Sequence, residues 1–239
     1  MERVCYVVRH AESRYNAAVK GLSLSGMVGE RDHGLSEVGR SQCLLLRSRL
    51  LELAAKGDAD AIAMVSGLWL CSPLRRALMT AALARGFGDR PLVALPDGRE
   101  HCMAPLIARD SVGTPRRAIA SQLSREVGES TPVDLSFVDS EIWWRVAESS
   151  QSVNKRIGNL LEELYKRCEH QPAVFVGHSR ALRDMFKVYS ENRSSCTTKC
   201  GGSLASTLVA NCAVLKLVIT PGKNIRKADF LFDSGYKTT

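Results

Sequence analysis

Short apolar runs that alternate with amphipathic segments constrain the fold of this chain more than any other feature. The runs are rich in Val and Leu and mostly lack polar alternation, which is typical of parallel strands covered on both faces. They span residues 4–8, 67–71, 92–95, 173–176 and 208–219. Apolar residues recur at helical spacing in 36–55, 73–85, 152–168 and 181–189. The alternation predicts an α/β fold: a three-layer α/β/α sandwich around a mostly parallel sheet, with 4–8 as its central strand.

Three stretches lack either pattern. Residues 21–34 are rich in Gly and Ser, residues 104–144 are long and mixed, and residues 190–206 are polar. Long excursions from a compact α/β core are typical of lids and binding loops. Since 239 residues fit one α/β domain, we expect a single domain, 1–239.

Charged residues stand directly after several of the predicted strands. Arg9 and His10 follow the first strand, and His178 follows the run at 173–176. We expect Ser72 and Ser179 to be the N-caps of the helices that come next, with Pro73 in the first helical position, and Ser36 to be the N-cap of the helix over 36–55. Ligands of an open parallel sheet bind beyond the carboxyl ends of its strands. These side chains therefore predict a site at that edge.

Arg75 and Arg76 indicate the kind of ligand. Both fall in the first turn of a predicted helix, where cations are mildly unfavourable unless an anion is bound. A histidine among arginines is typical of nucleophilic phosphoryl transfer, since imidazole can attack phosphorus while guanidinium groups neutralise its oxygens. The leaving group would need an acid, and Asp97 and Glu100 are both candidates that spacing alone does not separate.

Composition narrows the class of partner. The net charge is +8, but the basic residues are spread along the chain and aromatic residues make up only 6%. This favours a phosphorylated substrate over a nucleic acid. No run approaches the roughly 20 apolar residues of a membrane helix, and the N-terminus lacks a signal-peptide pattern, so we expect a cytoplasmic protein that does not enter a membrane.

The eight cysteines are scattered, and several lie inside apolar runs. They are interpreted as reduced core residues. Cys196 and Cys200 form a C-x-x-x-C, but no second Cys/His pair with zinc spacing accompanies them. We therefore expect neither a metal site nor a cofactor.

Motifs over nearly the whole chain resemble those of the histidine phosphatase superfamily, in the same order. R-H-A-E-S-R-Y-N at 9–16 resembles the signature R-H-G-E-S/T-x-x-N. H-G-L-S-E-V-G-R-S-Q at 33–42 is similar to L-S/T-x-x-G-x-x-Q, and C-S-P-L-R-R-A-L-M-T-A at 71–81 to S-P-L-x-R-A-x-x-T-A. R-E-H at 99–101 and V-G-H-S-R at 176–180 complete the series. The resemblance implies a phosphoglycerate mutase-like fold with a cap insertion at about 104–148.

The resemblance also implies residue roles. His10 would be the nucleophile that becomes phosphohistidine, and Glu100 rather than Asp97 the proton donor. Arg75 falls on a variable position of its motif, so Arg76 is the arginine implied. The phosphate pocket would be formed by Arg9, Arg76 and His178, with Asn16 beside it.

Some positions depart from the family patterns. Ala11 replaces the usual glycine, and Gly98 stands where a leucine often precedes the acid. The acid is followed by H-C-M-A-P, not by the E-R-x-Y-G of the mutases. This favours a metal-independent phosphatase acting on a small-molecule or protein phosphomonoester. The alternatives are a mutase-type phosphotransferase and a binding or scaffold protein with weak catalysis. Within the cap, we expect Trp143, Trp144 and Glu148 to brace structure.

G-H-S-R-A at 177–181 raises one rival, since it nearly matches the nucleophile elbow G-x-S-x-G of serine hydrolases. That fold needs a histidine after its serine in the chain, and no histidine follows His178. Ser179 is therefore interpreted as an N-cap whose backbone helps to bind phosphate.

Overall fold

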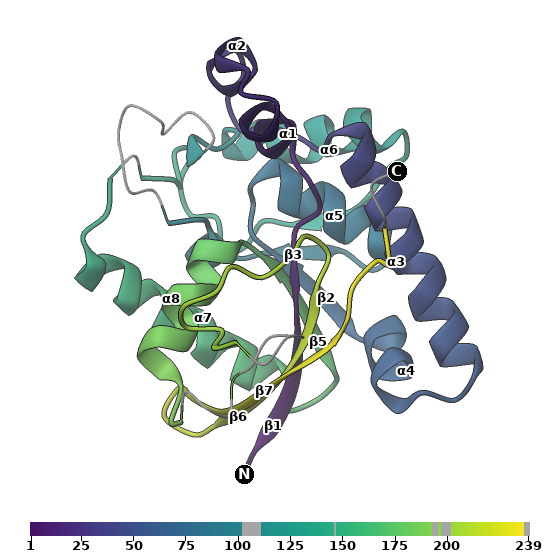
Figure 1. The fold of residues 1–239 in the computed structure, drawn as a ribbon, viewed down its shortest axis with the longest axis vertical. Helices are drawn as coiled ribbons and strands as arrows, with labels where there is room; N and C mark the ends of the chain where they lie inside the picture. The colour runs from purple at the N-terminus through teal and green to yellow at the C-terminus, as the bar shows by residue number, and fades with distance from the viewer. Residues whose placement is uncertain (102–110, 146, 193–195, 197–201, 237–239) are drawn as a thin grey trace.

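The computed structural model describes residues 1–101, 111–145, 147–192, 196 and 202–236. Its strands are β1 (Arg3–Arg9), β2 (Leu68–Cys71), β3 (Leu92–Ala94), β4 (Val133–Asp134), β5 (Ala173–Gly177), β6 (Val214–Thr220) and β7 (Asn224–Phe232). They form one sheet in the order β4-β3-β2-β5-β1-β6-β7 (Figure 1). β1 to β5 pair in parallel, whereas β6 is antiparallel to both β1 and β7. The prediction of a mostly parallel sheet is confirmed.

Helices cover both faces of this sheet, which confirms the predicted three-layer sandwich (Figure 1). The α-helices are α1 (Arg14–Lys20), α2 (Leu24–Val28), α3 (Glu37–Ala55), α4 (Ala59–Ser66), α5 (Arg75–Arg85), α6 (Ile119–Val127), α7 (Ser150–Arg167) and α8 (Ser179–Tyr189). Short 3-10 turns form η1 (Pro96–Gly98) and η3 (Arg116–Ala118). No helix within the described ranges is long and apolar enough to span a bilayer.

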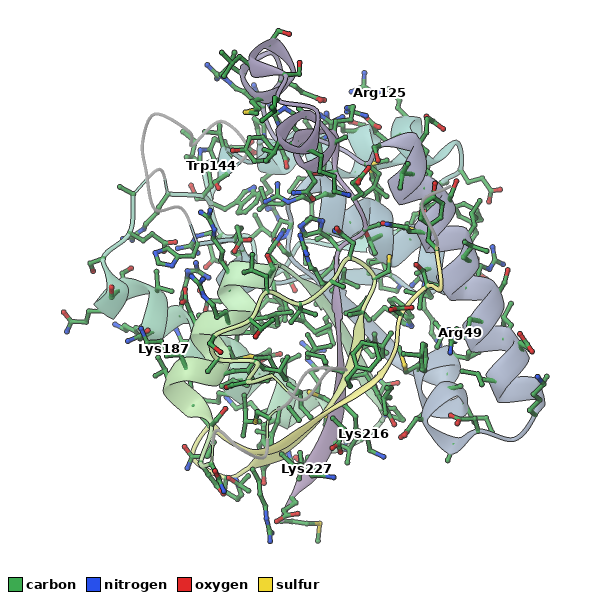
Figure 2. The ribbon with its side chains drawn as sticks, in the orientation of Figure 1. Arg49, Arg125, Trp144, Lys187, Lys216 and Lys227 are labelled. Atoms are coloured by element: carbon green, nitrogen blue, oxygen red, sulfur yellow. The ribbon has the colours of Figure 1, made fainter. Side chains whose placement is uncertain are left out.

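The side chains of β1 point alternately into two cores. Tyr6 and Val8 pack in the core that contains residues of α3, α4, α5 and α6, whereas Cys5 and Val7 pack with α7 and α8. Side chains fill the space between the layers (Figure 2). Because both faces of β1 are buried, its sequence carries no polar alternation.

Two strand predictions are corrected. β5, not β1, is the middle strand of the sheet, and β1 lies between parallel β5 and antiparallel β6. The strand predicted over 208–219 begins only at Val214, and β6 extends to Thr220. The chain turns before β6, where Cys212 adopts a left-handed φ of 55°. A β-strand cannot continue through that conformation.

The predicted N-cap of α3 is right, and the other two are wrong. Ser36 caps α3 by accepting the N–H of Gly39. α5 begins at Arg75 after Leu74, and Ser72 accepts the N–H of Leu74 in the turn before the helix. α8 begins at Ser179 itself, so its N-cap is His178. In both corrected cases a carboxylate from a distant segment accepts the first-turn N–H groups, as described below.

Part of the predicted cap belongs to the core of the fold. Residues 104–110 lie outside the described residues, and so do Lys199 and Cys200 of the 190–206 loop. Of the rest, β4 extends the sheet beside β3, and α6 packs in the core with α5. Trp143 is buried, donates from its indole to the carbonyl of Thr114, and packs edge-on against Trp144.

Candidate active site

His10 stands directly after β1. Its amide donates to the carbonyl of Gly177 at the end of β5, 2.9 Å away. Its ring nitrogen Nδ1 lies 2.6 Å from the carbonyl oxygen of Ala11. Because a carbonyl oxygen only accepts hydrogen bonds, we assign the ring proton to Nδ1 and a lone pair to Nε2. The ring is therefore anchored through one nitrogen and nucleophilic at the other.

A second buried histidine, His178, lies beside it, with the ring centres 5.1 Å apart. Burial, followed by the positive charge of Arg76, lowers the pKa of both histidines well below the ordinary value. Both rings are thus neutral at pH 7. Neither ring nitrogen of His178 has a hydrogen-bond partner among the described residues. Buried polar atoms without a partner are rare, and a bound ligand can satisfy them.

Arg9 ends β1 and is held by the loop that returns over this strand. Its amide donates to the carbonyl of Ala213, and its Nη1 donates to the carbonyl of Val209. In the same loop, the side-chain amide of Asn211 donates to the carbonyl of His10, 2.8 Å away. Nε of Arg9 is buried without a partner in the part of the chain that the structure describes. It is available to an anion.

The two arginines at the start of α5 have different surroundings. Arg75 pairs with Glu30, 2.7 Å from its Nη1, and also with Glu126. Arg76 is only 1% exposed, and after burial its charge is the largest cause that lowers the pKa of the two histidines. The structure therefore brings Arg76 to the histidines and directs Arg75 into a separate ion-pair network.

Thr80 connects α5 to the backbone directly after His10. Its Oγ1 accepts the N–H of Ala11 at 3.0 Å and donates to the carbonyl of Arg76 at 2.6 Å. Ala11 is fully buried at this junction. The threonine of the 71–81 motif thus fixes the chain on both sides of the site.

Asp32, which sequence reasoning missed, caps α5. One carboxylate oxygen accepts the N–H of Arg75 at 2.9 Å, and the other accepts the N–H of Thr114 at 2.9 Å. Burial raises the pKa of Asp32 to about 6, although the charge of Arg76 opposes the shift. The sequence predicts an anionic ligand at this helix N-terminus; the first N–H group of the helix is instead bound by the side chain of Asp32, immediately before the 33–42 motif.

Glu100 follows β3 and faces the start of α8. Its Oε1 accepts the N–H groups of His101 and Ala181, each at 2.9 Å. Its Oε2 receives only a longer contact, 3.4 Å, from the N–H of Arg180. Burial lowers the pKa of Arg9, and the negative charge of Glu100 opposes that shift. The carboxylate therefore stabilises the charged form of Arg9. Oε2 is therefore the less saturated oxygen of this carboxylate.

The remaining candidates have mixed placements. Ser179 is buried in the first turn of α8, next to His178. Asn16 lies in α1, where its side chain accepts the N–H of Ser13 in a capping box. Asp97 lies in η1, and burial raises its pKa. Asn16 bonds within its own helix cap, and Asp97 bonds to the side chain of Asn159 on α7.

The 33–42 motif fastens the backbone that follows His10. The side-chain oxygen of Gln42 accepts the N–H of Glu12 at 2.9 Å. The hydroxyl of Ser36 donates to the carboxylate of Glu12 at 2.8 Å. Gly39 lies so close that an added Cβ would stand 2.0 Å from the carbonyl oxygen of Glu12. The motif therefore docks α3 against the loop that follows His10.

Comparison with known proteins identifies the family. The model of the histidine phosphatase superfamily (branch 1) matches residues 5–224. The chain belongs to the histidine phosphatase superfamily. No curated protein matches the sequence significantly.

Solved structures share the fold of this histidine phosphatase superfamily member at low identity. "Mycobacterial hydrolase 1" is 18% identical with a TM-score of 0.52, covering 98% of this chain and 99% of its own. A candidate alpha-ribazole-5'-P phosphatase from Escherichia coli is 16% identical with a TM-score of 0.55, covering 97% and 95%. A phosphoserine phosphatase from Entamoeba histolytica, in complex with 3-phosphoglyceric acid, is 16% identical with a TM-score of 0.51, covering 95% of both chains. At these identities the likeness shows the fold alone.

The site offers a neutral imidazole at His10, nitrogens of Arg9 and His178 that lack partners among the described residues, and the carboxylate of Glu100. Within the described ranges no group of three or more His, Cys, Asp or Glu side chains could hold a metal ion. The arrangement is suited to binding a tetrahedral dianion and attacking it at phosphorus.

Proposed function

We propose that this protein is a phosphatase that hydrolyses phosphomonoesters through a phosphohistidine on His10. The observation that carries the proposal is the fixed ring of His10, whose Nε2 lone pair lies among polar nitrogens that lack partners. Neutral imidazole is a nucleophile, and the donors of Arg9, Arg76 and His178 suit the oxygens of a phosphoryl group.

In the first half-reaction, Nε2 of His10 attacks phosphorus opposite the leaving oxygen. The N–P bond forms as the P–O bond breaks, and Glu100 transfers a proton from its carboxyl group to the departing alkoxide. Arg9 and Arg76 neutralise the equatorial oxygens. The alcohol leaves, and the phosphoryl group stays on His10.

In the second half-reaction, Glu100 is a carboxylate and accepts a proton from water. The water oxygen attacks phosphorus, the N–P bond breaks, and the electron pair returns to Nε2. Orthophosphate is released, and Glu100 is protonated again. The cycle closes with no net change in the protein.

The charge for both steps comes from the chain, so we propose that the reaction needs no added metal ion. Hydrolysis is favoured over mutase chemistry because Glu100 is not followed by the E-R-x-Y-G pattern of the mutases. The named structural neighbours include phosphatases, which agrees with the proposal without carrying it.

The test is phosphate release from p-nitrophenyl phosphate and from a panel of phosphomonoesters, before and after treatment with EDTA. We expect full activity in EDTA. Labelled substrate quenched in base should leave an acid-labile label on the protein. His10→Ala should abolish both the label and phosphate release. Normal turnover by His10→Ala would reject the proposal, and transfer of phosphate between two hydroxyl groups without hydrolysis would favour the mutase.

A further inference from the structure

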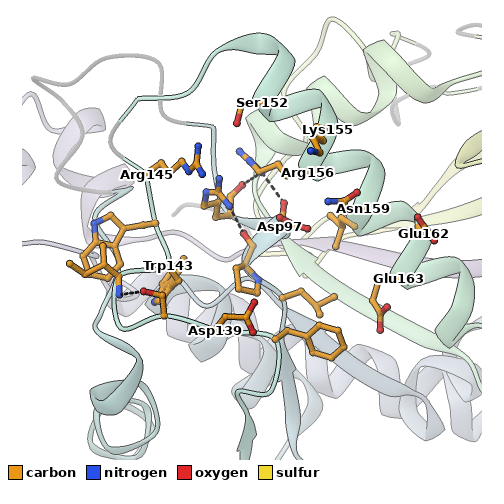
Figure 3. Close-up of a pocket in the computed structure, with 18 of the residues that line it drawn as sticks. Asp97, Asp139, Trp143, Arg145, Ser152, Lys155, Arg156, Asn159, Glu162 and Glu163 are labelled. Carbon is orange, nitrogen blue, oxygen red and sulfur yellow. Dashed lines mark hydrogen bonds between the residues drawn. The ribbon is translucent and has the colours of Figure 1, made fainter.

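A buried arginine on α7 holds the segment that carries Glu100. Arg156 is only 4% exposed. Its Nη1 donates to the carbonyls of Asp97 and Arg99, at 2.9 and 2.8 Å, and its Nη2 reaches the carbonyl of Glu100 at 3.4 Å. Figure 3 shows the guanidinium of Arg156 directed at this segment beside a cavity of about 700 Å³. One side chain thus binds three carbonyls of the short stretch that leads to the proposed acid.

Glu148 holds that arginine in place. Its side chain is fully buried and accepts from Nε and Nη2 of Arg156, at 3.1 and 3.0 Å, and from Nη2 of Arg99. Burial alone would raise the pKa of Glu148, but the hydrogen bonds and charges of the two arginines lower it below its ordinary value. A carboxylate that accepts from two nitrogens along one edge of the planar guanidinium fixes the orientation of that group.

The opposite side of the segment rests on the sheet. Gly98 packs so closely on β5 that an added Cβ would lie 2.3 Å from the ring of Phe175. Residues 97–100 are therefore confined between an aromatic ring below and the guanidinium of Arg156 on the side. The N–H groups of Ala181 and His101 further restrict rotation of the Glu100 side chain.

We propose that Arg156, held by Glu148, is a positioning residue that fixes the backbone of Glu100 and thereby aligns its carboxyl group with the leaving group. The inference rests on the proposed phosphatase function. It assigns Arg156 no contact with substrate. Its contribution is to keep the acid oriented, since general acid catalysis requires the proton within hydrogen-bond reach of the leaving oxygen.

Arg156→Lys tests this, because one ammonium group cannot reproduce the planar fork that reaches all three carbonyls. We expect kcat for phenyl phosphate, whose leaving group needs a proton, to fall by roughly ten- to 100-fold. The fall for p-nitrophenyl phosphate should be several times smaller, with KM little changed for both. Glu148→Gln should act in the same direction. Arg167→Lys, on the same helix but paired with Glu163 nearer the surface, is the matched control.

A second readout does not depend on activity. The amide hydrogens of Arg180 and Ala181 are bonded to the carboxylate of Glu100, so they report its position. In Arg156→Lys, but not in Arg167→Lys, their hydrogen exchange should accelerate relative to the amides of β5. Uniform acceleration over the whole chain would mean that Arg156 only stabilises the fold.

Two results would overturn the inference. One is an equal loss of kcat for both substrates, and the other is unchanged exchange at Ala181. A wild-type protein that hydrolyses neither substrate would instead reject the proposed function. In that case the exchange experiment alone would still decide whether Arg156 positions Glu100.

Discussion

At the scale of single residues, the charge state of His10 decides whether the site can react. Burial, then Arg76 and Arg9, lower its pKa well below the ordinary value. We therefore expect the His10 ring to remain neutral at pH values where an exposed histidine is protonated. NMR titration of the ring in the free protein measures this directly.

The same titration separates the two neighbouring arginines. Arg76→Met should raise the pKa of His10 toward its ordinary value, because one of the positive charges that oppose protonation is removed. Arg75→Met should leave it close to the wild-type value. An equal response to both substitutions would contradict the placement of Arg76 at the histidines.

Asp32 gives a second prediction, on the pH dependence of stability. The sign of this dependence is opposite to that of a carboxylate in a salt bridge. Its pKa is raised to about 6 in the folded state, so the native protein binds more protons than the unfolded chain between about pH 4 and pH 6. The stabilising contribution of Asp32 is therefore largest in acid and declines as pH rises through this window.

We expect the difference in unfolding free energy between wild type and Asp32→Asn to fall by up to about 3 kcal/mol from pH 4 to pH 7, since each pKa unit is worth about 1.4 kcal/mol. Urea titrations at several pH values measure it. Asn cannot titrate, so it removes the pH dependence while keeping an acceptor for the N–H of Arg75. A difference that rises with pH would show that Asp32 is instead ionised at low pH.

At the scale of elements, α3 packs through Gly39 against the loop that follows His10. Gly39→Ala would place a methyl group 2.0 Å from the carbonyl oxygen of Glu12, where no side-chain rotation relieves the contact. We expect a loss of about 1–3 kcal/mol in unfolding free energy and a fall in kcat. Gly88→Ala is the matched control, because an added Cβ there meets nothing within 4 Å. Similar losses for both variants would show that α3 does not act through Glu12.

The elements that could be read from sequence are those with buried faces. β1 and β5 are apolar runs and α7 carries an apolar stripe, so their patterns identify them. α3 has a weaker pattern, because its Leu44, Leu45 and Leu51 are exposed. β7 was missed because polar residues interrupt it, as its partly exposed pattern requires, and two-residue β4 is too short for any pattern. The N-caps of α5 and α8 could not be predicted, since Asp32 and Glu100 reach those helices from distant segments.

The residues of the candidate site could be predicted only where their place in the sequence distinguishes them. Arg9 ends β1, and His10 and His178 come directly after strands, so position alone marks them as candidates. Arg75 and Arg76 are chemically identical neighbours, and only their partners in space separate them. Arg156 could have been found from the sequence. It occupies the apolar stripe of α7, one turn after Val153, where an unpaired charge would be costly, so its position indicates a buried partner.

At the scale of the whole molecule, a net charge of +8 should attract an anionic substrate. The charge is diffuse, and Figure 2 labels basic side chains on different elements: Arg49, Arg125, Lys187, Lys216 and Lys227. We expect kcat/KM to fall by roughly two- to tenfold between about 10 and 150 mM salt, with kcat nearly constant. Steady-state kinetics at several salt concentrations test this, and an unchanged KM would contradict it.

The loop that returns over the end of β1 has a consequence for the newborn chain. Val209, Asn211 and Ala213, which hold Arg9 and His10, follow them by about 200 residues in the chain and are therefore synthesised much later. Until they are made, the hydrogen bonds that orient the end of the first strand cannot form. On the proposed mechanism, a nascent chain that lacks this loop should therefore not attack phosphate esters.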